Sequence, residues 1–307
     1  LLAFSSINTE QCKRGSLFLC IFAMRVTTSC RLPCASMVSF TSLPLDFSLF
    51  LRVALDSVFN QTVVPTEVVL VEDGPLTTEL DSVIDEYSKH YAQLKVIKLP
   101  VNGGLGRALR VGLRHCSYDL VARMDTDDIC RSNRFERQLR VFEQQPELSV
   151  CGGWISEFSN DPEKPHSYRK LPELSTAISA FGQKRNPVNH MTVMFKKADV
   201  EACGGYQDYP LFEDYYLWVR MLVSGCKFYT IQDVLVNVRA DLGMIARRGG
   251  LRYARTEIRL QFLFYGLRYI GFVTMLQNIA IRFTTRIMPR GVRSWLYKKK
   301  LRYNEAK

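Results

Sequence analysis

Short apolar runs alternate with stretches of helical periodicity between residues 47 and 145. Three runs rich in Val, Leu and Ile predict strands, at residues 67–71, 94–99 and 119–124. Apolar residues recur at helical spacing in the other segments, namely 47–58, 76–91, 105–115 and 133–145. Alternation of strands and helices is typical of a mainly parallel sheet flanked by helices. We therefore expect an α/β fold.

The second half of the chain has a different rhythm. Residues 159–172 contain three prolines and predict a loop. Strands are predicted at 191–195 and 234–239, and a helix that begins with two acids is predicted at 213–225. Beyond Gly243, apolar and basic residues at helical spacing predict helices to about residue 300.

Polar residues follow each of the first three predicted strands. Asp73 comes after the first strand, Asn102 after the second and Asp125 after the third. Ligands of parallel sheets bind at the carboxyl ends of the strands. We therefore expect these polar groups to meet at one edge of the sheet.

Three carboxylates crowd together in the segment Asp125-Thr126-Asp127-Asp128. Like charges repel one another and burial strengthens the repulsion, so a positive group should sit among them. A divalent cation, Mg²⁺ or Mn²⁺, with oxygen ligands is the candidate, and such an ion would in turn hold phosphate. The alternative is a solvated turn in which Asp128 caps the following helix.

Glu213 and Asp214 stand at the start of a predicted helix. Carboxylates at this position can simply complement the helix dipole. Beside an aromatic pair that faces a sugar, one of them would instead supply a general base. The motif alone does not separate these two interpretations.

Three further motifs have both a binding and a structural interpretation. Gly104, just before a predicted helix, could hold a phosphate on backbone N–H groups or form a close-packed turn. Leu109 stands where the dinucleotide fingerprint needs glycine, so we exclude a nicotinamide cofactor. Arg247 and Arg248 could clamp a diphosphate or begin the basic C-terminal segment. His190 is a lone histidine, which is commonly a hydrogen-bonded structural residue.

The net charge of +11 is concentrated at the C-terminal end. Residues 251–307 hold 13 Lys and Arg against two acids, so the rest of the 307-residue chain is neutral. Aromatic and basic residues on helices suit a membrane interface, and no nucleic-acid-binding motif accompanies them. The alternative is a helix pair packed on the catalytic domain with basic faces in solvent. No stretch of 18 residues is free of charge, so we expect no transmembrane helix.

Nine cysteines occur without a C-x-x-C pair, which favours reduced thiols in the cytosol. We therefore expect a cytoplasmic protein, peripheral on the inner face of the plasma membrane.

Several motifs, taken in order, resemble family 2 glycosyltransferases with the GT-A fold. The match covers about residues 47–250, and within the family the chain resembles bacterial exopolysaccharide-assembly enzymes of the amylovoran type. The motifs are Gln61-Thr62, Val71-Glu72-Asp73-Gly74, Asn102-Gly103-Gly104, Met124-Asp125-Thr126-Asp127-Asp128, Arg134-Phe135, Gly204-Gly205-Tyr206, Glu213-Asp214-Tyr215-Tyr216-Leu217-Trp218 and Arg247-Arg248-Gly249-Gly250.

The resemblance implies an inverting transfer of a sugar from a nucleoside-diphosphate donor, expected to be a UDP-sugar, to a lipid-linked saccharide. Exopolysaccharide, capsule or O-antigen assembly would be its setting. Asp214 would be the catalytic base, with Glu213 beside it. Asp127 would be the main metal ligand, with Asp125 and Asp128 next to it. The other expected contacts are Glu72, Asp73, Asn102, Gly104, Arg107, Asp125, Arg247 and Arg248 for the nucleotide-sugar, and Trp218 and His190 for the acceptor.

The same resemblance divides the chain into segments. Residues 46–245 would be the GT-A domain, with a nucleotide-binding half at 46–158 and an acceptor half at 159–245. Residues 246–307 would be a basic amphipathic helical tail. Residues 1–45 are atypical, since the expected first strand has only the poor match Met37-Val38-Ser39-Phe40. We hypothesise that this segment is not native to the reading frame or that the gene is damaged, which would impair activity.

Two other functions fit parts of the pattern. A metal-dependent phosphohydrolase would use a D-x-D motif, but it needs Thr or Val where Ile129 stands, on an early strand. A non-catalytic basic adaptor for a membrane surface would account for the tail, yet it leaves Glu213, Asp214 and Asp73 without a role.

Overall fold

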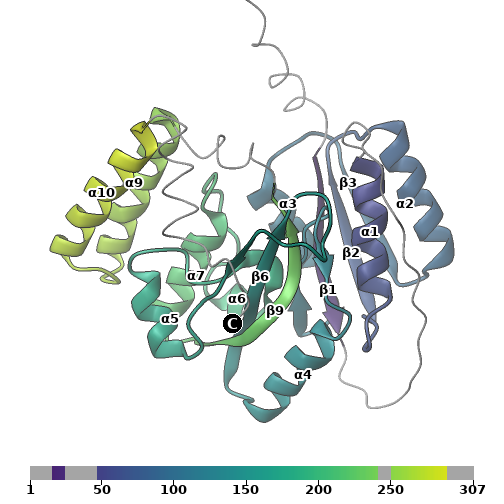
Figure 1. Cartoon of the computed structure of the whole chain (residues 1–307), viewed down its shortest axis with the longest axis horizontal. Helices are drawn as coiled ribbons and strands as arrows, with labels where there is room; N and C mark the ends of the chain where they lie inside the picture. Colours follow the sequence, from purple (N-terminus) through teal and green to yellow (C-terminus); the bar gives the residue numbers. More distant parts are fainter. Residues whose placement is uncertain (1–15, 25–46, 241–249, 289–307) are drawn as a thin grey trace, which may run out of the picture.

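A central sheet with helices on both faces forms the body of the molecule (Figure 1), as the computed structural model describes it for residues 16–24, 47–240 and 250–288. The strands are β1 (Ser16–Met24), β2 (Glu67–Asp73), β3 (Leu94–Leu99), β4 (Leu120–Ala122), β5 (Ile129–Cys130), β6 (Leu148–Phe158), β7 (Ser167–Arg169), β8 (Met194–Lys196) and β9 (Lys227–Arg239). The helices are α1 (Phe47–Phe59), α2 (Thr78–His90), α3 (Leu105–His115), α4 (Arg134–Gln144), α5 (Ser175–Gly182), the 3-10 turn η1 (His190–Thr192), α6 (Lys197–Ala202), α7 (Glu213–Val223), α9 (Leu251–Gly266) and α10 (Phe272–Ile287).

The sheet runs in the order β3-β2-β1-β4-β8-β6-β9-β5, and β7 pairs with β6. Strands β2, β3, β4, β6 and β9 share one direction, whereas β1, β5, β7 and β8 run against them. The expected α/β class is therefore correct, but the sheet is mixed rather than mainly parallel. The antiparallel strands lie between or beside the parallel ones, so most neighbouring pairs are antiparallel.

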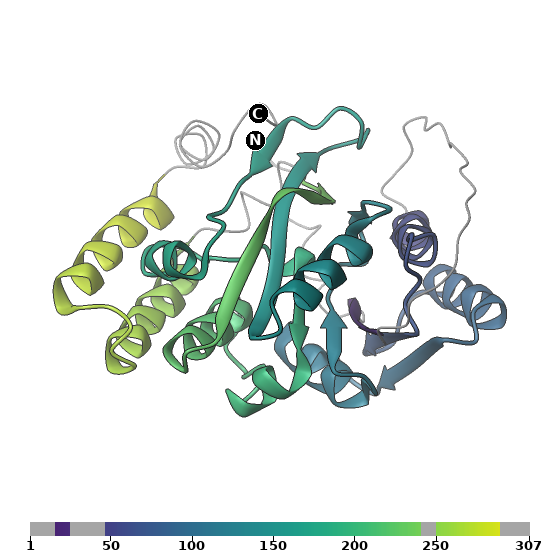
Figure 2. The same ribbon diagram turned by 90° about the horizontal axis from the view of Figure 1, so that it is seen from below.

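Alternate residues of each strand point to opposite faces of the sheet, which produces two apolar cores. Val68 and Leu70 of β2 pack with α1, α2 and α4, while Val69 and Val71 pack with α3, α6 and α7. All four side chains are fully buried. Figure 2 shows the molecule from below, with α1 and α2 at one end and α9 and α10 at the other.

Local sequence pattern located most elements between residues 47 and 145. The helix predicted at 105–115 is α3, and the one predicted at 133–145 is α4, one residue shorter at each end. The long strand β6 was not predicted, and β9 begins seven residues before the predicted start at 234. The predicted loop at 159–172 contains the short strand β7.

Within the segment that the sequence marks as atypical, the structure describes only β1. This strand lies between β2 and β4 and runs antiparallel to both. The weak first-strand candidate at 37–40 lies outside the described residues. Whether residues 1–45 are native thus stays a hypothesis.

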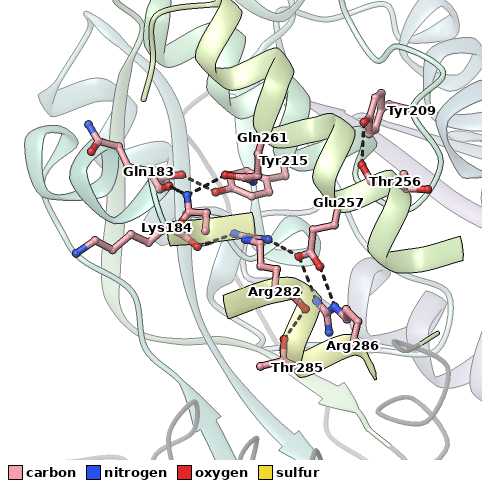
Figure 3. Close-up of polar contacts among 12 residues, drawn as sticks. Gln183, Lys184, Tyr209, Tyr215, Thr256, Glu257, Gln261, Arg282, Thr285 and Arg286 are labelled. Atoms are coloured by element: carbon pink, nitrogen blue, oxygen red, sulfur yellow. Dashed lines mark hydrogen bonds and ion pairs between the residues drawn. The ribbon is translucent and has the colours of Figure 1, made fainter. Parts of the chain in front are cut away.

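The helices expected beyond Gly243 form an antiparallel hairpin of α9 and α10. Its core includes Leu260 and Phe264, which pack against Tyr215 and Val219 of α7. Glu257 of α9 is buried and binds Arg282 and Arg286 of α10 (Figure 3). The two guanidinium groups point toward the one carboxylate, and Arg286 Nε lies 2.8 Å from its Oε2. Part of the basic charge of the tail is therefore used inside the fold.

Candidate active site

Asp73, at the end of β2, holds the glycine loop that precedes α3. Its two carboxylate oxygens accept hydrogen bonds from the backbone N–H groups of Gly103 and Gly104, at 2.8 and 2.7 Å. Gly74 makes this close approach possible, because its φ is +95° and a Cβ there would lie 2.8 Å from Asn102 N. The ends of β2 and β3 thus meet at one edge, as their sequence positions predict.

The remaining expected donor contacts surround this loop. Glu72 is buried and forms an ion pair with Lys98 at 3.3 Å, while burial raises its pKa. Asn102 is exposed. The side chain of Arg107 covers Gly103, since a Cβ on that glycine would lie 2.3 Å from Arg107 Cδ. That Glu72, Asn102 and Arg107 contact a nucleotide stays a prediction. Asp73 has no exposed surface, and both of its carboxylate oxygens bind the glycine loop.

Arg123 supplies a positive group among the acids that follow β4. It is 3% exposed, and its Nη1 donates to Oδ2 of Asp125 at 2.8 Å, while Nη2 binds the other oxygen. The pairing is bidentate, the geometry that favours arginine with carboxylates. From the sequence we expected a positive group among these carboxylates, and the candidate was a metal ion. A guanidinium fills part of that role.

Among the described residues, no ion pair joins a cation to Asp127 or Asp128. Burial, and then the charge of Asp125, raise the pKa of Asp127 to about 6. The pKa of Asp128 is raised well above its usual value, by burial first and by Asp127 next. Asp128 Oδ1 accepts the backbone N–H of Arg239 at 3.0 Å. Its buried Oδ2 has no hydrogen-bond partner in the part of the chain that the structure describes.

This donor set fits a hard divalent cation in part. Two neighbouring carboxylates and an unpaired buried oxygen on Asp128 are suitable oxygen ligands. No group of three His, Cys, Asp or Glu side chains in residues 16–24, 47–240 and 250–288 could hold an ion without other ligands. Mg²⁺ is commonly bound by one or two carboxylates together with substrate phosphates, which is compatible with this arrangement.

Arg134 holds the backbone beneath the acidic cluster, and sequence reasoning gave it no role. It is completely buried on α4. Its Nη2 donates to the carbonyl oxygens of Arg123 and Val193, at 2.8 and 3.2 Å, and its Nε donates to Gln138 Oε1 at 3.0 Å. The segment that leads into Asp125 is therefore fixed from below. The buried position of the side chain is a tertiary fact that the motif Arg134-Phe135 does not reveal.

Glu213 and Asp214 begin α7 and differ in their surroundings. Glu213 is 7% exposed, and burial followed by the charge of Asp214 raises its pKa to about 7. Asp214 is half-buried, and burial raises its pKa too. Asn186 Nδ2 donates to Oδ2 of Asp214 at 2.6 Å, and this bond opposes the rise. Arg169 in turn donates to the carbonyl oxygen of Asn186 at 2.7 Å.

The acids of α7 lie close to the other two clusters. A Cβ on Gly106, in the first turn of α3, would lie 3.6 Å from Cβ of Glu213. Burial raises the pKa of Asp127 and that of Asp214, and the charge of Arg123 opposes the rise at both. The charge of one buried guanidinium therefore acts on the D-x-D segment and on the expected base.

Trp218 and His190 are both buried, and their contact with the acceptor stays a prediction. Trp218 has no exposed surface and packs in the core with Phe195 and Phe228. His190 is 8% exposed, its Nε2 lies 2.9 Å from the hydroxyl of Tyr206, and its pKa falls well below the usual value because of burial. After its first turn α7 is covered by the sheet on one side and by the α9–α10 hairpin on the other, which buries the tryptophan.

Two expected residues cannot be placed, and several others were missed. Arg247 and Arg248 lie outside the described residues. Asn186 and Arg169 were not predicted, although the segment Asn186-Pro187-Val188-Asn189-His190 drew attention through its histidine. Arg239, the last residue of β9, was also missed, and it lies beside the acidic cluster.

Comparison with known proteins identifies the class of this site. The family model Glycosyl transferase family 2 matches residues 48–201. A UDP-Gal:alpha-D-GlcNAc-diphosphoundecaprenol beta-1,3-galactosyltransferase of Escherichia coli is 40% identical over 84% of this chain and 93% of its own length. The amylovoran biosynthesis glycosyltransferase AmsE of Erwinia amylovora is 38% identical over 81% of this chain and 92% of its own.

A solved structure gives the same result for the fold. Residues 1–349 of S. aureus TarS, in complex with UDP-GlcNAc, match with a TM-score of 0.59 and 15% identity, over 83% of this chain and 73% of that one. This likeness assigns the GT-A fold. The family model and the two relatives assign the activity class, and together they show that the chain is an enzyme of glycosyl transferase family 2.

Proposed function

We propose that this glycosyltransferase moves a sugar from a UDP-sugar to a lipid-linked saccharide, with inversion at the anomeric carbon. The names of the two bacterial relatives support the proposal, since one acts on a diphosphoundecaprenol-linked sugar and the other in amylovoran biosynthesis. The observation that carries it is the position of Asp214, which is half-buried, oriented by Asn186 and within range of the charge that acts on Asp127.

Asp214 takes the proton of the acceptor hydroxyl as that oxygen attacks the anomeric carbon. Direct displacement with one base inverts the carbon, by the same logic as in inverting glycosidases. The hydrogen bonds from Asn186 and from Tyr215 N, both 2.6 Å, fix the carboxylate for this step. Glu213 lies next to the base. Because its pKa is raised to about 7, Glu213 is partly protonated at neutral pH and so carries less negative charge beside Asp214.

Asp127 and Asp128 would hold the divalent cation. The bound ion would neutralise charge on the leaving diphosphate, which is the usual contribution of a metal in such a site. The pairing of Asp125 with Arg123 leaves Asp127 as the principal ligand. An Asp127→Asn variant should lose metal-dependent binding of UDP, measured by calorimetry with and without Mn²⁺.

Transfer of radiolabelled sugar from a panel of UDP-sugars to undecaprenyl-diphosphate-GlcNAc tests the activity. Asp214→Asn should abolish transfer and retain UDP binding, whereas Asp85→Asn, a change at an exposed residue of α2, should have no effect. Full transfer by Asp214→Asn would exclude it as the base. Release of free phosphate without transfer would instead favour the phosphohydrolase.

We further infer that the α9–α10 hairpin docks on an anionic membrane surface. No described helix is both long and apolar enough to cross a bilayer. Along residues 250–288, the only acid is the buried Glu257, while Arg252, Arg255, Arg259 and Arg268 are exposed. The outer face of α10 is apolar and exposed at Phe272, Val273, Leu276, Phe283 and Ile287. Cationic side chains next to an apolar stripe suit lipid headgroups and acyl chains.

Flotation of the full chain with vesicles tests this docking. The protein should float with vesicles that contain phosphatidylglycerol and stay behind with neutral ones. Changing Arg252, Arg255 and Arg259 together to Gln should abolish flotation. A matched triple change at exposed lysines outside the hairpin, Lys89, Lys95 and Lys164, should not. Equal flotation of both triple variants would contradict the docking surface.

A further inference from the structure

Arg239 lies next to the acidic cluster because of a strand pairing between distant parts of the chain. β5 follows the acids directly and runs antiparallel to β9, with Ile129 opposite Asn237 and Cys130 opposite Val236. The end of β9 therefore lies beside Asp128, whose Oδ1 accepts the backbone N–H of Arg239. The backbone of Arg239 thus lies beside the carboxylates at which the diphosphate is expected to bind.

Two aromatic rings hold the guanidinium of Arg239. Its Cζ lies 3.9 Å from the ring centre of Phe50 in α1 and 4.8 Å from that of Phe158 at the end of β6. Arginine stacks well on aromatic faces, because its planar group is weakly hydrated. These contacts occupy the faces of the guanidinium and leave the N–H groups at its rim for hydrogen bonds.

The hydrogen-bond donors of Arg239 are not used by the described residues. Within the described part of the chain its buried Nε has no partner, and no ion pair joins the side chain to Asp127 or Asp128. Burial lowers the pKa of Arg239, and the charges of these two carboxylates oppose the fall. Arg134, by contrast, donates to two carbonyl oxygens and to Gln138, and Arg123 is paired with Asp125. A partly buried cation with unused donors beside carboxylates that suit a metal ion is an incomplete site.

We propose that Arg239 binds the diphosphate of the nucleotide-sugar donor and stays on the leaving nucleoside diphosphate as the glycosidic bond breaks. This inference rests on the proposed function, because it needs a donor with a diphosphate. A planar guanidinium matches two phosphate oxygens in bidentate fashion, and each charge-assisted hydrogen bond is stronger than a neutral one. The stacking on Phe50 and Phe158 fixes the orientation of the fork before the donor arrives, so little ordering remains to be done on binding.

From the sequence, Arg247 and Arg248 were candidates for binding the diphosphate. The present inference gives that role to Arg239. Those residues lie outside the described part of the chain, whereas Arg239 belongs to the sheet. A cation on a strand is held more rigidly than one on a loop, which favours electrostatic stabilisation of developing charge. Arg239 is therefore the described arginine best placed to act on the leaving group.

Calorimetry on the full chain with UDP, UMP and uridine, each with and without Mn²⁺, tests the assignment. Arg239→Gln should weaken UDP binding by about 10- to 100-fold, the effect of losing hydrogen bonds to a charged group. Uridine carries no phosphate, so its affinity should not change. Arg239→Lys keeps the charge without the planar fork, so its UDP affinity should lie between those of the unmodified protein and Arg239→Gln. Phe50→Leu removes one stacking face and should weaken UDP binding in the same direction by a smaller factor.

Arg137→Gln is the matched control, because Arg137 is a surface residue paired with Asp233. It should bind all three ligands like the unmodified protein. UDP affinity within twofold of the unmodified value in Arg239→Gln would overturn the inference and leave the proposed function standing. An equal loss for uridine and UDP would show a structural role and overturn it as well. Failure of the unmodified protein to bind UDP, GDP or dTDP would overturn both proposals.

Discussion

Asn186 donates its side-chain amide to the carboxylate of Asp214 across 28 residues of sequence, with 2.6 Å between Nδ2 and Oδ2. Arg169 in turn holds Asn186, because its guanidinium donates to the carbonyl oxygen of Asn186. The same guanidinium donates to Asn189 Oδ1 at 2.6 Å. The expected base is therefore oriented by a chain of hydrogen bonds that begins on β7, a strand within the segment predicted to be a loop. Asp214 does not depend on its own helix alone for its position.

Removing this amide should shift the pH dependence of the reaction. A hydrogen bond to a carboxylate stabilises its charged form, so Asn186→Ala should raise the pKa of Asp214 further. A base works only when it is deprotonated, and the acid limb of kcat/KM should therefore move to higher pH. The pH profile of sugar transfer measures the shift. Asn133→Ala, at an exposed position where the side chain makes no capping bond, should leave the profile unchanged.

Glu213 should make the fold less stable as the pH rises. Burial raises its pKa to about 7 in the folded chain, from 4.5 in a solvated reference. The folded state then binds more protons than the unfolded state between these values, so the free energy of unfolding falls as the pH rises through that window. The full effect is about 3 kcal/mol. Urea denaturation at pH 5 and pH 8 should show a smaller pH difference for Glu213→Gln than for the unmodified protein, and equal differences would refute the assignment.

Arg123 should be needed for stability above all at high pH. Its removal in Arg123→Met leaves Asp125, Asp127 and Asp128 without their buried counter-charge, and loss of one partner of a buried pair costs about 3–5 kcal/mol. Burial raises the pKa of Asp127 and of Asp128, so these two acids can take up protons as the pH falls, which relieves the repulsion. The loss should thus be largest at pH 8 and smaller at pH 5 in urea titrations. Arg137→Met, which breaks an exposed pair, should cost less than about 1 kcal/mol at either pH.

Glu257 should hold the C-terminal hairpin together. Glu257→Gln leaves Arg282 and Arg286 partly buried without their carboxylate, and the expected cost is about 3 kcal/mol. Asp233→Asn breaks a surface ion pair and should cost less than about 1 kcal/mol. Thermal unfolding compares the two. Similar melting temperatures for both variants would show that the buried cluster does not support the hairpin.

Sequence pattern reached the elements whose cause is local. Helical periodicity located α1, α3 and α4, and β-branched runs located β2 and β3. The meeting of Asp73 with the loop at Gly103 was foreseeable too, because neighbouring parallel strands end at the same edge.

The parts that escaped prediction depend on contacts between distant segments. Arg239 and Asp128 are 111 residues apart and meet only through the pairing of β5 with β9. Trp218 is close to Asp214 in sequence and was expected to contact the acceptor. Its burial follows from the packing of α7 between the sheet and the hairpin, which no local pattern reports. The assignment of a metal among the acids overlooked Arg123, although that residue stands two places before Asp125.

The pairing of β5 and β9 also sets an order for assembly during synthesis. A nascent chain that has been made only as far as α7 contains both acidic clusters, yet β6 then lacks its long parallel neighbour and β5 has no partner strand. Contacts between distant segments form late, because the loop between them must first be closed. The edge that carries the proposed site is thus completed only when β9 arrives, and until then the growing polypeptide exposes an unpaired edge that favours aggregation.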